Sequence, residues 1–346
     1  MPSGEAARDT RRALACPDKF RGTLTAIDAA RAIATGLLRA GFDDVRELPL
    51  ADGGEGTLDA LLGARGGSRR QARVTGPLGD EVDAEYGVLA DGTAIIEMAR
   101  ASGLELVSDN DPLRASTRGT GELIATARRN GATQIVVGVG GSGTTDGGLA
   151  AVEALGWSLA GVDVAVACDV DTPFLEAARV YGPQKGASPA QVELLTRRLA
   201  SIADIYLERT GVDVTELEGA GAAGGLAGGL AALGARLEPG FEVIAQAAGF
   251  DDAVEGVELV VTGEGRLDAT SFEGKVVGGV LEWAAELGIE RRAVIAGQIT
   301  DDARDELSVL GAKGYALVDR VWHSGEAFER AATLVEEAAV EAGRAT

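Results

Sequence analysis

Histidine is almost absent from this chain of 346 residues, which contains a single copy, His323. A two-histidine metal site therefore cannot form within one chain, and a Ser-His-Asp triad would have to use that residue. His323 lies in a Trp-His-Ser-Gly stretch outside the glycine-rich and carboxylate-rich motifs, so we expect a general base to be a carboxylate or a lysine. Cysteine is limited to Cys16 and Cys168, which imply no disulfide framework.

Basic residues are scarce as well, at 32 Lys and Arg against 54 Asp and Glu, which gives a formal net charge of −22. A chain this acidic repels phosphodiester backbones and anionic lipid, so we expect no nucleic acid and no membrane as partners. A small anionic substrate is still compatible with the composition, because a local pocket can be basic inside an acidic protein.

Long apolar segments are also missing. Residues 1–12 are polar and mixed in charge, without the apolar core of a secretory signal. The longest uncharged run, Gly219–Ala235, is short for a membrane span and rich in Gly and Ala. We therefore expect a cytoplasmic protein whose partners are small molecules, with a homodimer also allowed by the sequence.

The chain does contain a regular alternation of short apolar runs and Ala-rich segments, over a length that suits about two domains. Such alternation is typical of a parallel sheet covered by helices. Between residues 72 and 98, turn signals instead separate runs that favour antiparallel strands. We predict an α/β fold with two domains: a parallel, Rossmann-like or flavodoxin-like domain from residues 1–68 plus 244–346, and a mixed α/β domain inserted at residues 69–243.

The individual elements follow from the same patterns. The predicted strands are Ala13–Cys16, Val45–Leu50, Val82–Val88, Thr93–Met98, Gln134–Val139, Val162–Ala167, Leu259–Thr262, Ala293–Ala296 and Tyr315–Val318. The predicted helices are Thr25–Ala40, Gly56–Ala64, Gly121–Asn130, Asp146–Leu155, Pro189–Thr210 and Phe328–Ala342.

Glycine is abundant, at 50 residues, and two stretches match the GxGxxG pattern, Gly138–Gly143 and Gly219–Gly224. The pattern is weak by itself in so glycine-rich a chain. The first match follows a predicted strand and precedes a predicted helix, a context in which backbone N–H groups can bind an anion. Two other interpretations stay open: a tight strand-to-helix turn, and a dehydrogenase loop that binds NAD with Asp163 as the ribose ligand.

Four predicted strands end in loops that combine carboxylates with glycines. The loops are 17–22, 51–57, 168–171 and 262–268. Carboxylates at such positions can hold Mg²⁺ or accept a proton from a substrate hydroxyl. Five cations in or near these loops could neutralise the charge of a transferred phosphate: Lys19, Arg21, Lys185, Arg266 and Lys275. Glycine-rich anion-binding loops, carboxylates and a few cations are the residues that phosphoryl transfer requires, because this reaction depends on positioning and charge stabilisation more than on covalent catalysis. The near absence of histidine is compatible with it.

These motifs resemble those of the glycerate kinase type I family. They stand in family order as ACPDKFRGTLT (15–25), PLADGGEGT (49–57), GTGELI (119–124), GVGGSGTTDGG (138–148), ACDVD (167–171), YGPQKGA (181–187), GAGAAGG (219–225), VTGEGRLD (261–268) and GK (274–275). The resemblance implies ATP-dependent phosphorylation of D-glycerate, usually to 2-phosphoglycerate, with Mg²⁺. Two stretches, 156–167 and 171–181, are shorter than in typical members, so an inactive nucleotide-binding relative is a further alternative.

The resemblance and the loop positions together predict the site residues. As catalytic residues we predict Asp52 or Asp268 as the base, together with Lys275, and as substrate-binding residues Asp18, Lys19, Arg21, Glu55 and Arg266. The predicted nucleotide and phosphate ligands are Gly140, Gly141, Ser142, Thr144, Lys185, Gly221 and Gly224. The predicted metal ligands, direct or through water, are Asp146, Asp169 and Glu264.

Overall fold

The computed structural model describes residues 10–345, so most of the predicted polar tail, residues 1–9, lies outside the described part. The chain divides into two units, one built from both chain ends and the other from the middle. Unit 1 comprises Met1–Ala51 and Ala248–Thr346, and unit 2 comprises Asp52–Ala247.

The sheet of unit 1 is parallel throughout, with strand order β11-β10-β9-β1-β2. Its strands are β1 (Arg12–Ala15), β2 (Asp44–Glu47), β9 (Leu259–Leu267), β10 (Arg291–Ile299) and β11 (Lys313–Ala316). Strands from the beginning of the chain thus pair with strands from its end, because β1 lies between β2 and β9. This confirms the predicted parallel sheet built from both ends of the chain.

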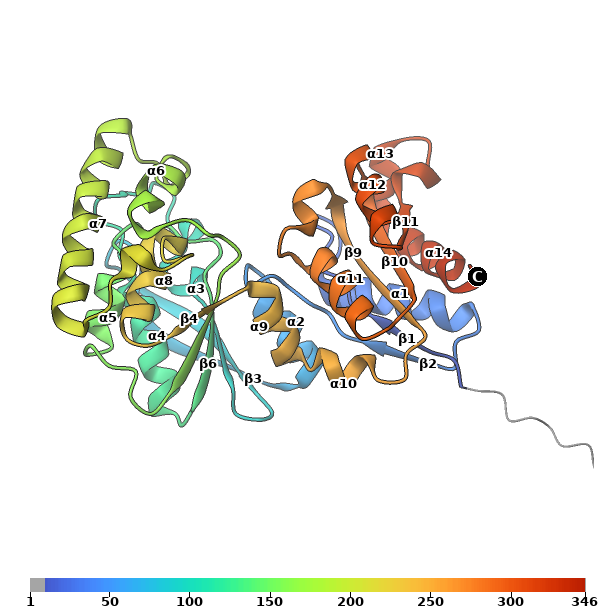
Figure 1. Cartoon of the computed structure of the whole chain (residues 1–346), viewed down its shortest axis with the longest axis horizontal. Helices are drawn as coiled ribbons and strands as arrows, with labels where there is room; N and C mark the ends of the chain where they lie inside the picture. Colours follow the sequence, from blue (N-terminus) through green and yellow to red (C-terminus); the bar gives the residue numbers. More distant parts are fainter. Residues whose placement is uncertain (1–9, 346) are drawn as a thin grey trace, which may run out of the picture. The chain divides into compact units, whose positions relative to one another are not determined.

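Helices cover both faces of this sheet. They are α1 (Ala26–Arg39), α10 (Phe250–Val254), α11 (Val276–Glu286), α12 (Asp301–Val309), α13 (Ser324–Glu329) and α14 (Ala331–Arg344). Figure 1 shows α1 and α14 side by side, and their contact is so close that a Cβ added at Gly36 would lie 2.3 Å from the Glu336 carbonyl oxygen. Helices α11 and α12 pack on the alternate residues of β10, such as Val294 and Ala296.

The sheet of unit 2 is mixed, with strand order β3-β4-β5-β6-β7-β8. Its strands are β3 (Gly67–Thr75), β4 (Glu81–Leu89), β5 (Ala94–Glu97), β6 (Gln134–Gly138), β7 (Asp163–Ala167) and β8 (Arg236–Glu238). The first three strands are antiparallel and β5 to β8 are parallel. The mixed sheet is as predicted, but strands β3 and β8 are missing from the prediction. The residues of β3 up to Gln71 are exposed, so that part of the strand has no buried, apolar face that a sequence pattern could indicate.

Unit 2 also contains a layer of helices. They are α2 (Thr57–Arg65), α3 (Ala99–Ser102), α4 (Arg118–Arg129), α5 (Leu149–Ala154), α6 (Ala177–Tyr181), α7 (Pro189–Thr210), α8 (Ala222–Ala232) and α9 (Gly240–Ala248). Helix α7 has the predicted bounds because Ser188 and Gln191 form a capping box ahead of it. Short 3-10 helices of unit 2, η1 to η4, lie at Leu104–Leu106, Phe174–Glu176, Pro183–Lys185 and Val214–Glu216, and two further ones, η5 (Ala269–Phe272) and η6 (Val318–Arg320), belong to unit 1.

The first boundary between the units falls after residue 51 and not after residue 68, where the sequence predicts it, and the second falls after 247 rather than 243. Helix α2 accounts for the first difference. Its Leu58 is fully buried and packs on β4, so that a Cβ added at Gly87 would lie 2.4 Å from Leu58 Cδ1. The apolar face of α2 therefore belongs to the core of unit 2.

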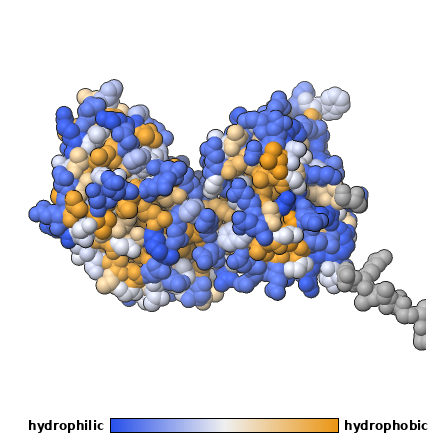
Figure 2. Space-filling model, in the orientation of Figure 1, coloured by the Kyte–Doolittle hydropathy of each residue, from blue (hydrophilic) through white to orange (hydrophobic). Residues whose placement is uncertain are grey.

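The surface of each unit combines polar and apolar residues. Figure 2 shows hydrophilic residues over much of the visible face of each unit, in keeping with the net charge of −22. Within the described residues, the structure contains no helix of the length and apolarity needed to span a membrane. The long uncharged run Gly219–Ala235 forms the buried helix α8 instead.

Candidate active site

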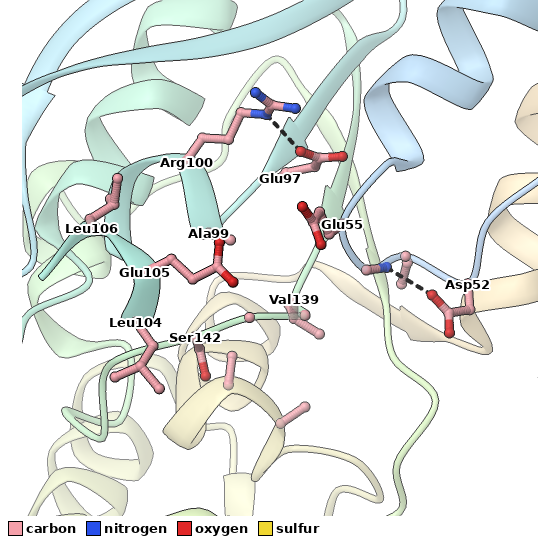
Figure 3. Close-up of a pocket in the computed structure, with 18 of the residues that line it drawn as sticks. Asp52, Glu55, Glu97, Ala99, Arg100, Leu104, Glu105, Leu106, Val139 and Ser142 are labelled. Carbon is pink, nitrogen blue, oxygen red and sulfur yellow. Dashed lines mark hydrogen bonds and ion pairs between the residues drawn. The ribbon is translucent and has the colours of Figure 1, made fainter. Parts of the chain in front are cut away.

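A pocket of about 960 Å³ lies within unit 2, beside the loops that follow strands β5, β6 and β7 (Figure 3). Residues from several separate segments line it, within 52–55, 99–106, 139–142, 169–170, 181–185 and 222–223, together with residues of β3, β4, β5 and the end of β7. Carboxyl ends of parallel strands are where α/β proteins bind ligands, because loops and helix N-termini converge there.

The Asp52–Gly56 loop, which leads into α2, has a defined conformation. Asp52 Oδ1 accepts a hydrogen bond from the Gly54 N–H at 3.1 Å, and Thr57 Oγ1 donates to the Gly54 carbonyl at 2.7 Å. Glycine is required at Gly53 and Gly56, whose φ angles are +87° and +96°. Both predicted site residues of this loop, Asp52 and Glu55, line the pocket.

The glycine loop after β6 has two roles in the structure. A Cβ at Gly138 would lie 2.3 Å from the Gly53 carbonyl oxygen, and one at Gly140 would lie 2.7 Å from Gly54 Cα. These two glycines therefore let the Asp52–Gly56 loop approach the end of β6. The next residues, Gly141 and Ser142, line the pocket together with Gly140.

The backbone of this loop presents donors to the pocket. In the described part of the chain, the N–H groups of Gly140, Gly141 and Ser142 donate no hydrogen bond. Consecutive unpaired N–H groups form a concave site that suits an anion. The loop therefore has the properties that the sequence predicts for a phosphate-binding loop.

Lys185 supplies a buried cation beside the pocket. Lys185 is only 2% exposed, and its Nζ donates a hydrogen bond to the Thr144 carbonyl oxygen at 2.7 Å. Burial lowers the pKa of Lys185 to about 7, although the charge of Asp146 opposes the shift. Among the residues that line the pocket, the cations are Lys185 and Arg100, and Arg100 forms ion pairs with Glu97 and Glu85.

The second glycine motif holds loops together. A Cβ at Gly221 would lie 2.4 Å from the Pro173 carbonyl oxygen, and one at Gly224 would lie 2.1 Å from the Thr144 carbonyl oxygen. The two glycines do not line the pocket, whereas Ala222 and Ala223 between them do. Thr144 is fully buried behind the wall, so a predicted phosphate contact through its side chain stays a prediction.

The two predicted metal ligands in unit 2 differ in environment. Asp146 is buried, which raises its pKa, and its two oxygens accept from the Thr117 N–H and hydroxyl and from the Gly148 N–H. It thus ties the start of α4 to the start of α5. Asp169 lines the pocket, and its Oδ1 accepts from the Gly240 N–H at 2.6 Å. Asp169 is therefore the better placed of the two to meet a ligand.

Unit 1 brings several other predicted residues together. The Asp18 N–H donates to the Gly263 carbonyl at 2.9 Å, and a Cβ at Gly265 would lie 3.0 Å from the Arg21 nitrogen. The loop that carries Asp18, Lys19 and Arg21 therefore lies along the carboxyl half of β9, which contains Glu264 and Arg266.

Asp268 and Lys275 meet at one hydroxyl. Asp268 Oδ1 accepts from Thr270 Oγ1 at 2.7 Å and from the Thr270 N–H at 3.1 Å, and so caps η5. Lys275 Nζ donates to the same Thr270 hydroxyl at 3.0 Å, while Arg266 lies 3.7 Å from Asp268. Three predicted site residues therefore form one polar cluster within unit 1.

The NAD interpretation conflicts with this geometry. The expected ribose ligand, Asp163, begins β7, at the opposite end of the parallel strands from the pocket, and it pairs with Arg236 at 3.2 Å. A ribose-binding carboxylate has to lie at the carboxyl end of its strand. In addition, the space beside Gly138 and Gly140 is filled by the backbone of Gly53 and Gly54, where a dinucleotide pyrophosphate would have to lie.

Among the residues of the pocket wall that sequence reasoning missed are Glu97 and Arg100. Glu97 is the last residue of β5, so the rule that drew attention to carboxylates at strand ends also applies to it. Arg100 follows three residues later in α3 and pairs with Glu97 (Figure 3). Unpaired backbone donors, a buried lysine and strand-end carboxylates together are the components of a small-molecule phosphotransferase.

Comparison with known proteins gives the particular family. The glycerate kinase family matches this chain over residues 13–163 and 157–346. Glycerate 2-kinase of Escherichia coli (strain K12) is 42% identical over 83% of this chain and 85% of its own, and a glycerate kinase of Halalkalibacterium halodurans is 40% identical over 93% and 95%. A crystal structure of a candidate glycerate kinase 2 from Salmonella typhimurium LT2 superposes with a TM-score of 0.82 at 32% identity, covering 97% of this chain and 98% of that one.

The chain therefore belongs to the glycerate kinase family, which confirms the resemblance seen in its motifs. It is a phosphotransferase, and its family membership implies ATP as phosphate donor and glycerate as acceptor.

Proposed function

We propose that this protein transfers the γ-phosphoryl group of ATP to the 2-hydroxyl group of D-glycerate, giving 2-phosphoglycerate and ADP. The observation that carries the choice of the 2-hydroxyl is the E. coli relative, named glycerate 2-kinase, at 42% identity. The pocket of unit 2 agrees with phosphoryl transfer, since it combines the donors of residues 140–142 with Lys185.

In this proposal, Asp52 accepts the proton of the substrate hydroxyl. The Asp52 side chain lines the pocket, and Oδ1 already accepts from the Gly54 N–H, which fixes the carboxylate. The hydroxyl oxygen then bonds to the γ-phosphorus as the bond to the bridging oxygen of ADP breaks. Lys185 and the N–H groups of residues 140–142 stabilise the negative charge of the phosphate.

The residues present also fit a magnesium ion. Mg²⁺ takes oxygen ligands and usually keeps several waters, bound through one or two carboxylates and the substrate phosphates. The described residues contain no cluster of three or more His, Cys, Asp and Glu side chains that could hold a metal by themselves. Asp169, in the pocket wall, is the carboxylate we propose for it; the bound ion would neutralise charge on the nucleotide phosphates.

The remaining site residues are also proposals. In unit 1, Arg21 and Lys275 are proposed to bind an anionic group of a substrate, because a guanidinium can hold a carboxylate through two hydrogen bonds. Asp18 and Lys19 lie in the same loop as Arg21, Glu264 and Arg266 lie in the carboxyl half of β9 beside it, and Asp268 follows that strand.

Product analysis tests the proposed function directly. The enzyme is incubated with Mg-ATP and D-glycerate, ADP release is followed, and the product is examined by proton-coupled ³¹P NMR. A phosphate on the 2-oxygen has one vicinal proton and gives a doublet, whereas one on the 3-oxygen has two and gives a triplet or a more complex multiplet. A doublet is expected. A 3-phosphate signal would move the reaction to the other hydroxyl, and nucleotide binding without ADP release would identify an inactive relative.

The buried lysine predicts how activity depends on pH. The amine must be protonated to bind phosphate, and burial lowers its pKa to about 7. We therefore expect kcat/KM for ATP to fall as the pH rises above that value, since this parameter reports groups of the free enzyme. In Lys185→Met, kcat/KM for ATP should be low and should not change as the pH rises through about 7. Lys313→Met, at an exposed position on β11, is the matched control and should keep the wild-type profile.

The titration of Lys185 should also make the free energy of unfolding depend on pH, in a direction that follows from its lowered pKa. In the unfolded chain Lys185 has its ordinary pKa of 10.5, whereas in the folded protein the pKa is about 7. Between these values the unfolded state binds more protons, so the free energy of unfolding contributed by Lys185 rises with pH. Denaturant titrations of wild type and Lys185→Met at several pH values check this, and a constant difference between them would contradict the lowered pKa.

A further inference from the structure

We propose that Glu97 is a positioning residue of this kinase, which acts by fixing the Asp52–Gly56 loop at the pocket. The proposal rests on the role proposed for Asp52, because the loop matters only through the side chain that it presents. The carboxylate of Glu97 belongs to β5, whereas the loop comes from an earlier part of the chain. Figure 3 shows Glu97 and Glu55 of the loop near one another in the pocket wall.

The first Glu97 oxygen caps helix α2 from outside the helix. Oε1 accepts from the Gly56 N–H at 3.0 Å and from the Leu58 N–H at 2.9 Å. Gly56 is the N-cap residue of α2 and has no side chain to perform this task. A negative charge at this place is also stabilised by the positive end of the helix dipole. Glu97 thus fixes the end of the loop at which α2 begins.

The second Glu97 oxygen is held in turn. Oε2 accepts from Arg100 Nε at 2.6 Å, and Arg100 Nη1 lies 3.3 Å from Glu85 Oε2. Glu97 is only 4% exposed, so its charge depends on these partners. Both oxygens face N–H donors. A glutamine at this position cannot accept hydrogen bonds from all of these donors. Its side-chain NH₂ group is itself a donor, and it would face either the Arg100 N–H or the backbone N–H groups of α2.

The opposite side of the loop is fixed by backbone packing. Gly53 and Gly54 lie against Gly138 and Gly140, and a Cβ at Gly53 would lie 2.8 Å from the Ala167 Cβ. The loop is therefore seated on the ends of β6 and β7, and Glu97 anchors it from the end of β5. Loss of one anchor leaves Asp52 attached to the sheet but free to vary in position, and small displacements of a reacting group reduce rate strongly.

A buried carboxylate could instead serve folding alone, so the test uses a matched control. Glu122 of α4 also accepts a backbone N–H, that of Thr75, at 2.7 Å, and it also pairs with an arginine, Arg118, at 3.8 Å. It does not line the pocket. Glu122→Gln therefore changes a carboxylate of the same unit that accepts a backbone N–H and pairs with an arginine but lies outside the pocket wall; its side chain is 30% exposed, against 5% for Glu97.

The experiment compares Glu97→Gln, Glu122→Gln, Asp52→Asn and the double variant Glu97→Gln/Asp52→Asn. Thermal unfolding, kcat and the KM values for ATP and glycerate are measured for each. If Glu97 acts through Asp52, Glu97→Gln lowers kcat by about tenfold or more, whereas Glu122→Gln changes kcat by less than about twofold. The kcat of the double variant should then equal that of Asp52→Asn to within about twofold, because both substitutions remove the same effect. Amide hydrogen exchange should also become faster at Gly56 and Leu58 in Glu97→Gln.

Each other outcome decides the question. A kcat loss in Glu97→Gln no greater than that in Glu122→Gln, or additive losses in the double variant, overturns the positioning role while leaving the base assignment intact. If Asp52→Asn keeps kcat within about tenfold, the proposed base is wrong, and a loss in Glu97→Gln then also overturns an action through Asp52. Should Glu97→Gln fail to fold, Arg100→Lys, which loosens the second oxygen only, is measured in its place with the same criteria.

Discussion

Replacing Asp52 by Asn is expected to lower kcat by about 10²- to 10⁴-fold, the usual contribution of a general base. The KM values for ATP and glycerate should change much less, because the loss concerns the transition state. Asparagine keeps an oxygen that accepts the Gly54 N–H, so the fold of the loop should survive. Steady-state kinetics with both substrates, together with thermal unfolding of the variant, measures the two effects separately.

Asp268→Asn is the matched comparison for this experiment. Asp268 also accepts a backbone N–H two residues ahead, that of Thr270, at 3.1 Å, and asparagine preserves this cap too. If Asp268→Asn shows the large loss and Asp52→Asn does not, the base lies in unit 1. If both variants fold and keep kcat within about tenfold, neither carboxylate is the base.

Replacing Gly138 by Ala is expected to destabilise unit 2 and remove most activity. The new Cβ would lie 2.3 Å from the Gly53 carbonyl oxygen and 3.2 Å from its carbon, so either the end of β6 or the Asp52–Gly56 loop must shift. Overpacking of this kind costs about 1–3 kcal/mol, occasionally more. The melting temperature and kcat of the variant give the two effects.

The control for this prediction is Gly325→Ala in α13, where an added Cβ would meet no atom within 4 Å. It should leave both the melting temperature and kcat near the wild-type values. Full stability of Gly138→Ala, with altered ATP kinetics alone, would show that the glycine serves the nucleotide and not the packing of the loop.

Much of the fold could be predicted from the sequence because local patterns specify it. The run Ile135–Val139 is apolar apart from one glycine, and its residues 135–138 form the buried part of strand β6. Helix α7 begins after its Ser188 cap and ends before Gly211, as these two residues indicate. Strand β3 and helix α8 are among the elements that were not predicted, together with β8, α9, α11 and α12, and in these two cases tertiary contacts decide the conformation. The exposed residues of β3 are held by pairing with β4. Helix α8 contains residues of positive φ at 223–225, and Ala223 is the one of these three that is not a glycine and therefore depends on its packing.

For the site, the sequence by itself determined the family and the residue types available for chemistry. Strand-end loops at Asp52, Asp169 and Gly140 follow from the order of elements, and in the structure they line one pocket. For the loops after β6 and β7 this is possible because parallel strands place their carboxyl ends at one edge of a sheet. The Asp52 loop follows β2, a strand of the other sheet, and reaches the same pocket through the close contact of Gly53 and Gly54 with Gly138 and Gly140.

Only the tertiary structure decided what each group contacts. Gly138 is a glycine because Gly53, distant in the sequence, approaches it, and Asp146 is enclosed by the donors of Thr117 and Gly148. The low pKa of Lys185 depends on its burial, and the cap on α2 comes from Glu97 of another strand. Such properties depend on distances between segments far apart in the chain. Residue type and spacing do not contain those distances, whereas packing of the sheet edge fixes them.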